Sequence, residues 1–179
     1  MVQPIGPLMI EHRLIERMIA VMKREVDRID IERTPNAVFI DTAVDFIRNY
    51  ADRCHHGKEE EILFRDLMKK NLTPDDKRVM DELIQEHIWG RATTRKLVEA
   101  ESSYLQGDSK AVDTITELMR QLAEFYPRHI AKEDKSFFKA AMKYFSKDEQ
   151  DAMLEEEYQF DREFIHKLYR NVVAQAEKP

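Results

Sequence analysis

Short breaks divide the chain into five long segments, and each segment has the apolar spacing of an amphipathic helix. The breaks consist of residues that typically begin or end helices, namely Gly6-Pro7, Thr34-Pro35-Asn36, the run 71–76, Gly107-Asp108 and the capping sequence 146–149. The predicted helices span about 7–32, 37–70, 74–107, 108–145 and 146–174. Short loops between long helices make consecutive helices antiparallel neighbours. The sequence therefore predicts an all-α fold, an up-down-up-down four-helix bundle with an additional C-terminal helix.

The length and charge of the chain limit the classes of protein to which it can belong. We expect the 179 residues to form a single domain, with the bundle at about 7–145 and the extra helix at about 146–174. The chain has no long apolar run and no signal-peptide pattern, so we expect a cytoplasmic protein without membrane contact. A net charge of -6 without a basic stripe argues against nucleic acid as a partner. The single cysteine, Cys54, excludes an internal disulfide and a cysteine-based metal site.

Two overlapping histidine–glutamate pairs lie in the second segment, in the run CHHGKEEEILF. An α-helix turns about 100° per residue, so Glu60 lies about 40° from His56, and Leu63 lies on the same stripe. His55 and Glu59 have the same spacing, but their stripe is of mixed polarity. The phase of an α-helix therefore predicts that His56 and Glu60 face the core.

The other three bundle segments also direct histidines toward the core. In the fourth, His129 and Glu133 lie on one stripe with Leu122. His12 in the first segment and His87 in the third share their faces with apolar residues. The candidate metal ligands are thus His12, His56, Glu60, His87, His129 and Glu133.

Burying six ionisable groups at one level would cost several kcal/mol for each group left without a partner. A divalent cation removes this cost, because neutral imidazole and carboxylate are ligands that iron and zinc accept. Six ligands exceed what one tetrahedral zinc takes, and they suit two ions bridged by Glu60 and Glu133. The alternative is a metal-free histidine cluster in the core, for which His129→Ala would hardly change the metal content.

The order His12, His56-xxx-Glu60, His87 and His129-xxx-Glu133 resembles the hemerythrin-like, or HHE cation-binding, family over residues 8–145. The resemblance implies a four-helix bundle around two iron ions, a non-haem di-iron centre bridged by oxo or hydroxo and two carboxylates. Members of that family bind dioxygen reversibly, sense oxygen or iron, or handle peroxide and nitric oxide.

Two positions depart from the oxygen-carrying type of that family. Arg91 stands where the type has a second histidine on the third helix, four residues after His87. The type's last carboxylate lies five residues after its last histidine, a position that Asp134 takes here. Since Asp134 lies about 140° from His129 on an α-helix, we expect Glu133 to be the ligand. The more open coordination favours redox chemistry or sensing over simple carriage.

We therefore expect a di-iron protein that binds or senses dioxygen or a related small ligand. The alternative in the same fold is an enzyme that reduces peroxide or nitric oxide with an unidentified electron donor, and repair of iron–sulfur clusters is a third option. A zinc-stabilised bundle that binds another protein is the alternative of another class. Self-association into a homo-oligomer is compatible with each of these roles.

Each of four further residues has two possible roles. Glu16 and Glu86 are expected to be surface charges, with a contact to a ligand histidine as the alternative. Tyr126 is expected to pack in the core, or else to donate a hydrogen bond to an oxygen species bound at the metal. Gly57 either marks a close approach of two helices or has no special role.

Overall fold

The computed structural model describes the backbone of residues 3–176, and long helices make up most of it. The elements are, in order, α1 (Ile5–Glu32), α2 (Ala37–Phe46), η1 (Ile47–His56), η2 (Glu59–Phe64), α3 (Arg65–Leu67), α4 (Pro74–Leu105), α5 (Ala111–Lys132), η3 (Glu133–Phe137), α6 (Phe138–Ala141), η4 (Met142–Tyr144) and α7 (Lys147–Ala176). Residues 37–67 are helical without interruption, and so are residues 111–144. No strand occurs among the described residues, which confirms the predicted all-α class.

Local capping explains why the helices begin where they do. The Asn36 side chain accepts a hydrogen bond from the amide of Phe39 at 3.2 Å before α2. Thr73 caps α4 through the amide of Asp76 at 3.1 Å, with a proline as the first helical residue. Ser146 and Glu149 exchange side-chain-to-amide hydrogen bonds before α7, which confirms the capping box expected there.

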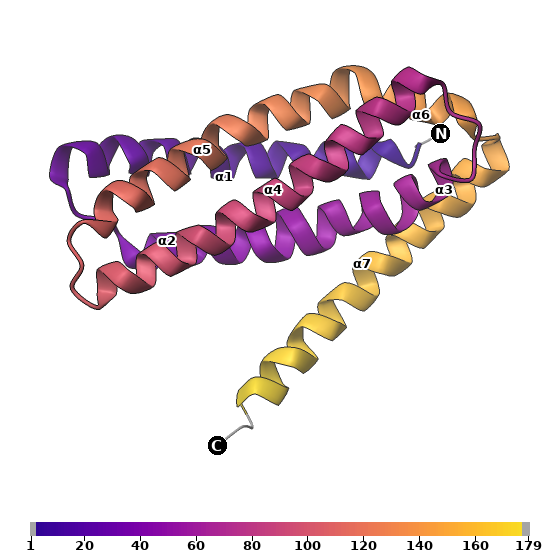
Figure 1. Cartoon of the computed structure of the whole chain (residues 1–179). Helices are drawn as coiled ribbons and strands as arrows, with labels where there is room; N and C mark the ends of the chain where they lie inside the picture. Colours follow the sequence, from indigo (N-terminus) through magenta and orange to yellow (C-terminus); the bar gives the residue numbers. More distant parts are fainter. Residues whose placement is uncertain (1–2, 177–179) are drawn as a thin grey trace.

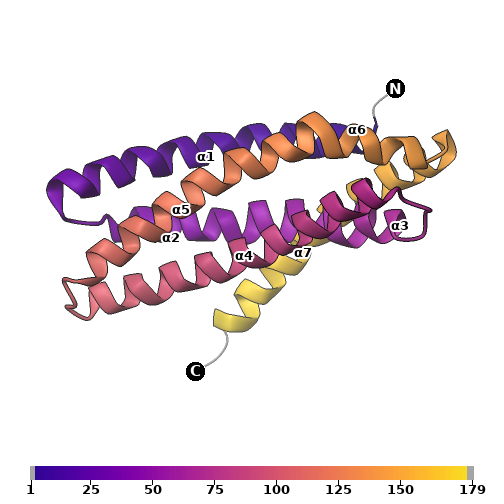
Figure 2. The ribbon, with the colours of Figure 1, turned by 45° about the horizontal axis from the view of Figure 1, so that its top comes forward.

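Four long helical stretches lie side by side, formed by α1, by α2 to α3, by α4, and by α5 to α6 (Figure 1). The loops after α1 and α4 lie at one end of the assembly, and the loop between α3 and α4 lies at the other end (Figure 1). The rotated view shows the same alignment (Figure 2). α7 runs obliquely to these stretches and passes beside the one formed by α2 to α3. Within residues 3–176, no helix has both the length and the apolar character needed to cross a bilayer.

The core consists of two apolar clusters with a polar layer between them. One cluster surrounds Met22 and Leu122, and the other surrounds Leu63 and Phe138. Each long stretch passes from one cluster to the other through a short polar segment. On α1, for example, His12 lies between Leu8 of one cluster and Ile15 of the other. The fold thus surrounds one buried polar layer with side chains that exclude water.

The backbone widens into π-helix at this layer. η1 ends with His55 and His56, η2 begins with Glu59, and η3 begins with Glu133. A π-helix forms hydrogen bonds from i to i+5 and therefore holds more residues per turn than an α-helix. π-Helical segments are rare and frequently occur at functional sites. Here they lie in the segments that supply the polar layer.

Candidate metal centre

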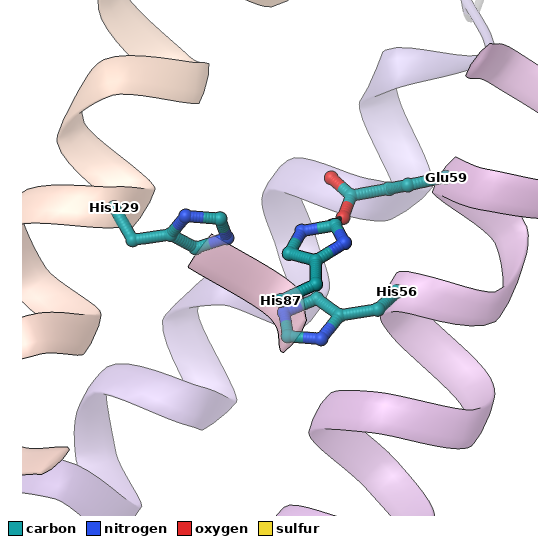
Figure 3. A group of neighbouring side chains, drawn as sticks. All are labelled: His56, Glu59, His87 and His129. Carbon is teal, nitrogen blue, oxygen red and sulfur yellow. Dashed lines mark ion pairs between the residues drawn. The ribbon is translucent and has the colours of Figure 1, made fainter. Parts of the chain in front are cut away.

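The polar layer contains five histidines and two glutamates, all with 3% or less of their surface exposed. They are His12, His55, His56, Glu59, His87, His129 and Glu133. They form two groups, each of which can bring its ligand atoms within 4.8 Å of one another. The first group is His56, Glu59, His87 and His129, and the second is His12, His55, Glu59 and Glu133. In Figure 3 the side chains of the first group converge from different helices on one region.

Both carboxylates lie between the groups. Glu59 Oε1 is 3.6 Å from His55 Nε2, and its Oε2 is 3.4 Å from His87 Nε2. Glu133 Oε2 is 3.2 Å from His12 Nε2, and its Oε1 is 3.2 Å from His129 Nε2. Each carboxylate therefore directs one oxygen to each group, which is the arrangement of a carboxylate that bridges two cations.

Many of these buried polar atoms have no hydrogen-bond partner. They include Nε2 of His12, His55, His87 and His129 and all four carboxylate oxygens of Glu59 and Glu133. Burial, together with neighbouring carboxylates, holds the pKa values of Glu59 and Glu133 well above the ordinary value. Leaving such groups unpaired costs about 1–3 kcal/mol each, and more when they are charged. Two divalent cations would satisfy this donor set, so the residues fit a metal pair.

Four of the histidines are held through their other ring nitrogen by a carboxylate. The Nδ1 atoms of His12, His55, His87 and His129 lie 2.7, 2.9, 2.7 and 2.8 Å from carboxylate oxygens of Asp134, Glu11, Glu60 and Glu86, respectively. An ionised carboxylate only accepts, so Nδ1–H donates and the lone pair of Nε2 faces the layer. Carboxylates that hold metal-binding histidines in this way fix the ring and raise its basicity as a ligand.

The electrostatics favour neutral imidazoles. Burial lowers the pKa values of His55 and His56 well below 6.5, and neighbouring histidines add to the effect. Burial also lowers the pKa of His129 to about 4, although Glu86 opposes the shift. These three rings are therefore uncharged at neutral pH, which is the form that binds a metal.

The structure brings five of the six residues predicted from the sequence into the layer, namely His12, His56, His87, His129 and Glu133. It corrects the inward position expected for Glu60, which is partly exposed and accepts hydrogen bonds from His87 at 2.7 Å and Arg91 at 2.8 Å. The prediction applied α-helical rotation to a π-helical stretch, where successive residues turn by a smaller angle. Glu59 therefore occupies the place expected for Glu60.

The sequence assigned no role to His55, and for Glu86 the structure shows the alternative expectation, a contact with a ligand histidine. His55 is buried in the second group, and Glu86 holds His129 instead of standing free at the surface. The sequence does carry a signal for His55. The doublet His55-His56 is followed by adjacent glutamates, so two histidine–glutamate pairs of the same spacing are available. By contrast, Glu16 forms a surface ion pair with Arg13 at 2.9 Å, as expected for a surface charge.

A second buried polar group joins the layer to α7. Lys58 is fully buried and donates to Glu11, which holds His55, and to Asp161 Oδ2 of α7 at 3.1 Å. Glu157 of α7 is also fully buried, and burial raises its pKa to about 8 although Lys58 opposes the shift. Residues of α7 therefore contact the set that supports one ligand histidine.

Comparison with known proteins agrees with this geometry. The family described as hemerythrin HHE cation binding domain matches residues 3–141. An uncharacterized protein of Mycobacterium tuberculosis, Rv1995, and one of Mycobacterium bovis, Mb2018, are each 25% identical over 133 residues. The alignment covers 74% of this chain and 51% of each relative, so it extends over about half of their length. No solved structure matches the chain significantly.

Proposed function

Because this chain belongs to the hemerythrin HHE cation-binding domain family, we propose that its polar layer holds two iron ions and binds or senses dioxygen or a related small ligand. One observation carries the proposal: Glu59 and Glu133 each direct one carboxylate oxygen to one histidine group and the other oxygen to the second group. Two cations held there would each receive one oxygen from Glu59 and one from Glu133. Two iron ions would supply the electrons that dioxygen or peroxide chemistry requires.

The ligands would include five of the six residues predicted from the sequence, with Glu59 in place of Glu60 and with His55 added. His56, His87 and His129 would hold one ion, and His12 and His55 would hold the other. Glu59 and Glu133 would bridge the two ions. Glu60 would act through His87, whose Nδ1 hydrogen bond it accepts. The ion with two histidines would keep the more open coordination. The oxygen-carrying type of the family has a second histidine on the third helix, at the position that Arg91 takes here.

The protein's own groups prepare this site in two ways. Carboxylates fix four of the imidazole rings, so the ligand nitrogens need little rearrangement when a cation binds. The two apolar clusters cover both ends of the layer and exclude bulk water, which strengthens every electrostatic interaction inside it. A preformed, dry site of this kind suits the binding of a small, weakly polar ligand.

Residues 1–179 would form one cytoplasmic domain, of which 1–2 and 177–179 lie outside the described residues. The bundle of about 7–145 would have the up-down-up-down order, which the alternating ends of the connecting loops support. The helix at about 146–174 would belong to the same domain, since Asp161 and Glu157 contact or approach Lys58 of the bundle.

The optical spectrum of the anaerobically reduced protein, recorded before and after air is admitted, tests this function. A visible band that appears with air and disappears on deoxygenation would support reversible binding. Irreversible conversion to an oxidised spectrum would support a sensor or a reducing enzyme that uses the same site. A colourless protein with stoichiometric zinc would contradict the di-iron proposal and favour a structural role.

A further inference from the structure

Three aromatic rings in contact, here called the ring path, join the polar layer to the surface between α4 and α5. The ring path begins at His129, whose imidazole is stacked on Phe125 with 5.1 Å between the ring centroids and 23° between the ring planes. Phe125 in turn contacts the indole of Trp89 on α4, with 4.7 Å between the centroids. Both distances lie in the range over which aromatic rings pack directly against each other. One intervening ring therefore connects a candidate metal ligand to Trp89.

Trp89 is the exposed end of the ring path. It is 38% exposed, whereas His129 is 2% exposed and Phe125 is partly buried against the apolar core. A Cβ atom added at Gly90 would lie 3.6 Å from Cε1 of Phe125, so the phenyl ring rests against the backbone of α4. The ring path thus leads from the dry layer to solvent.

The other aromatic contacts of the layer lead to buried rings. Within the described part of the chain, each of the other non-histidine rings connected to the layer's histidines, directly or through another ring, is 3% exposed or less. These rings are Phe64, Tyr126, Phe137 and Phe138. Among the described residues, Trp89 is therefore the one exposed ring that such contacts reach from the layer.

The ring path suits the transfer of electrons to the layer. An electron from outside has to cross protein, because the two apolar clusters cover both ends of the layer. Electron tunnelling weakens exponentially with distance, and π orbitals in contact carry it better than saturated side chains do. The two ring contacts bring the centroids of the indole and of the His129 imidazole within about 10 Å of each other. The ring path can therefore conduct single electrons.

We propose that single electrons enter the metal pair at Trp89, through Phe125 and His129, from an outer-sphere reductant that contacts the exposed indole. In each transfer the reductant loses one electron, and the ferric ion bound by His129 gains it and becomes ferrous, while no bond forms or breaks. The inference rests on the proposed function and adds an electron route to the same site. Electrons would arrive at the ion held by three histidines, whereas the ion held by two keeps the more open coordination.

The fluorescence of Trp89 tests the ring path, because Trp89 is the single tryptophan of the chain. In the ferric protein the excited indole should transfer an electron to the metal, so its fluorescence lifetime should be several-fold shorter than in zinc-loaded protein, since zinc has no redox chemistry. Phe125→Leu should restore most of the lifetime. Energy transfer to iron depends on distance and not on Phe125, so an equally short lifetime in Phe125→Leu would overturn the inference.

Phe46→Leu is the matched control for Phe125→Leu. Phe46 is partly buried and packs on the same apolar cluster as Phe125. Its ring is stacked on Tyr50 at 5.0 Å, and no aromatic contact among the described residues joins this pair to the layer. Phe46→Leu should therefore keep the short lifetime of the ferric parent protein. An equal lengthening in both variants would show that lost packing is responsible, which contradicts the ring path.

Reduction of the ferric protein by the methyl viologen radical, followed by stopped flow, tests electron entry itself. Trp89→Leu should be reduced several-fold more slowly than the parent protein, and Trp89→Phe should recover part of the rate because it keeps a ring. Ile88→Ala alters the neighbouring exposed residue of α4 and should be reduced at the parent rate. Equal rates in Trp89→Leu and the parent protein would overturn the inference, and so would a loss of iron from Trp89→Leu, because the slower reduction would then reflect a damaged site.

The iron content of the purified protein tests the proposed function separately. If the chain holds no iron, loading with Cu²⁺, which imidazole ligands bind, tests the ring path alone. A shortening of the Trp89 lifetime by Cu²⁺ that Phe125→Leu abolishes would support the ring path without iron. An equal shortening in both proteins, or none in either, would overturn it.

Discussion

Glu59 and Glu133 connect the two histidine groups in parallel. Glu59 reaches His55 and His87 through its two oxygens, and Glu133 reaches His12 and His129 in the same way. Both carboxylates are fully buried, and burial raises the pKa of each; repulsion from Glu59 raises the pKa of Glu133 further. Two carboxylates so placed stabilise the fold when cations lie between them and destabilise it otherwise.

Replacing Glu59 or Glu60 by glutamine, one at a time, distinguishes the bridging residue from the supporting one. We expect Glu59→Gln to lose most of its bound metal, since the amide cannot carry the negative charge that both groups share. Glu60→Gln should keep its metal and lose at most about 10- to 100-fold in affinity, because it acts through His87. The amount of metal that remains bound per chain after dialysis measures the effect of both substitutions. Equal retention in the two variants would contradict the assignment.

Glu86 provides a second comparison. Its Oε2 accepts from His129 Nδ1 at 2.8 Å, and its Oε1 accepts from Lys132. Glu86→Ala should weaken metal binding by about 10- to 100-fold, because His129 loses the carboxylate that orients it. Glu82 lies one turn earlier on α4 and approaches Lys132 at 3.5 Å without contacting a histidine, so Glu82→Ala is the control. Competition with a chelator gives both affinities, and a similar loss in Glu82→Ala would refute the role of Glu86.

Glu157 should make the stability of the protein depend on pH. Its carboxyl ionises near pH 4.5 when unfolded and near 8 when folded, so the folded state binds more protons between these values. Stability therefore decreases as the pH rises through this window. Glu157→Gln removes the loss and should raise the free energy of unfolding by up to about 3 kcal/mol at pH 7, with no gain at pH 4.

Urea unfolding at the two pH values measures this change. Glu155→Gln is the control, since Glu155 is an exposed glutamate on the same helix. An equal gain at pH 4 and pH 7 would show that the effect does not arise from ionisation of Glu157.

Gly57 permits the close approach of α7. A Cβ atom at this position would lie 2.9 Å from Cζ of Phe160, closer than side chains normally pack. Gly57→Ala should therefore destabilise the parent protein by about 1 kcal/mol or more. In a Phe160→Ala background the same change should stabilise it by up to about 1 kcal/mol, because alanine favours helix over glycine. Thermal unfolding of the four proteins gives both values, and the same sign in both backgrounds would contradict the contact.

Local signals made most of the helix boundaries predictable. Thr73 and Pro74 begin α4, and Ser146 with Glu149 begins α7, because capping and the fixed φ of proline depend on a few adjacent residues. The inward histidines of α1, α4 and α5 were predictable for a related reason. These helices keep α-helical rotation up to His12, His87 and His129, so the apolar stripe points to the same face as the histidine.

The inward residues of the second stretch, formed by α2 to α3, could not be predicted in this way. Its backbone is largely π-helical from Ile47 to Phe64, and the sequence does not reveal this. Tertiary contacts decide that conformation, because a π-helix is unfavourable by itself and persists where surrounding groups hold it. Assuming 100° per residue therefore selected Glu60 in place of Glu59. The supporting roles of Glu11 and Asp134 were also missed, and that of Glu86 was only the alternative expectation, since each reaches its histidine from a different helix.

Anomalous X-ray diffraction at the iron absorption edge, on crystals of the purified protein, tests the central assignment most directly. We predict two iron peaks in the polar layer, both ligated by Glu59 and Glu133, with His55 bound to one of them and Glu60 remaining on Nδ1 of His87. A single peak, an ion ligated by Glu60, or a layer without iron would contradict the two-metal assignment.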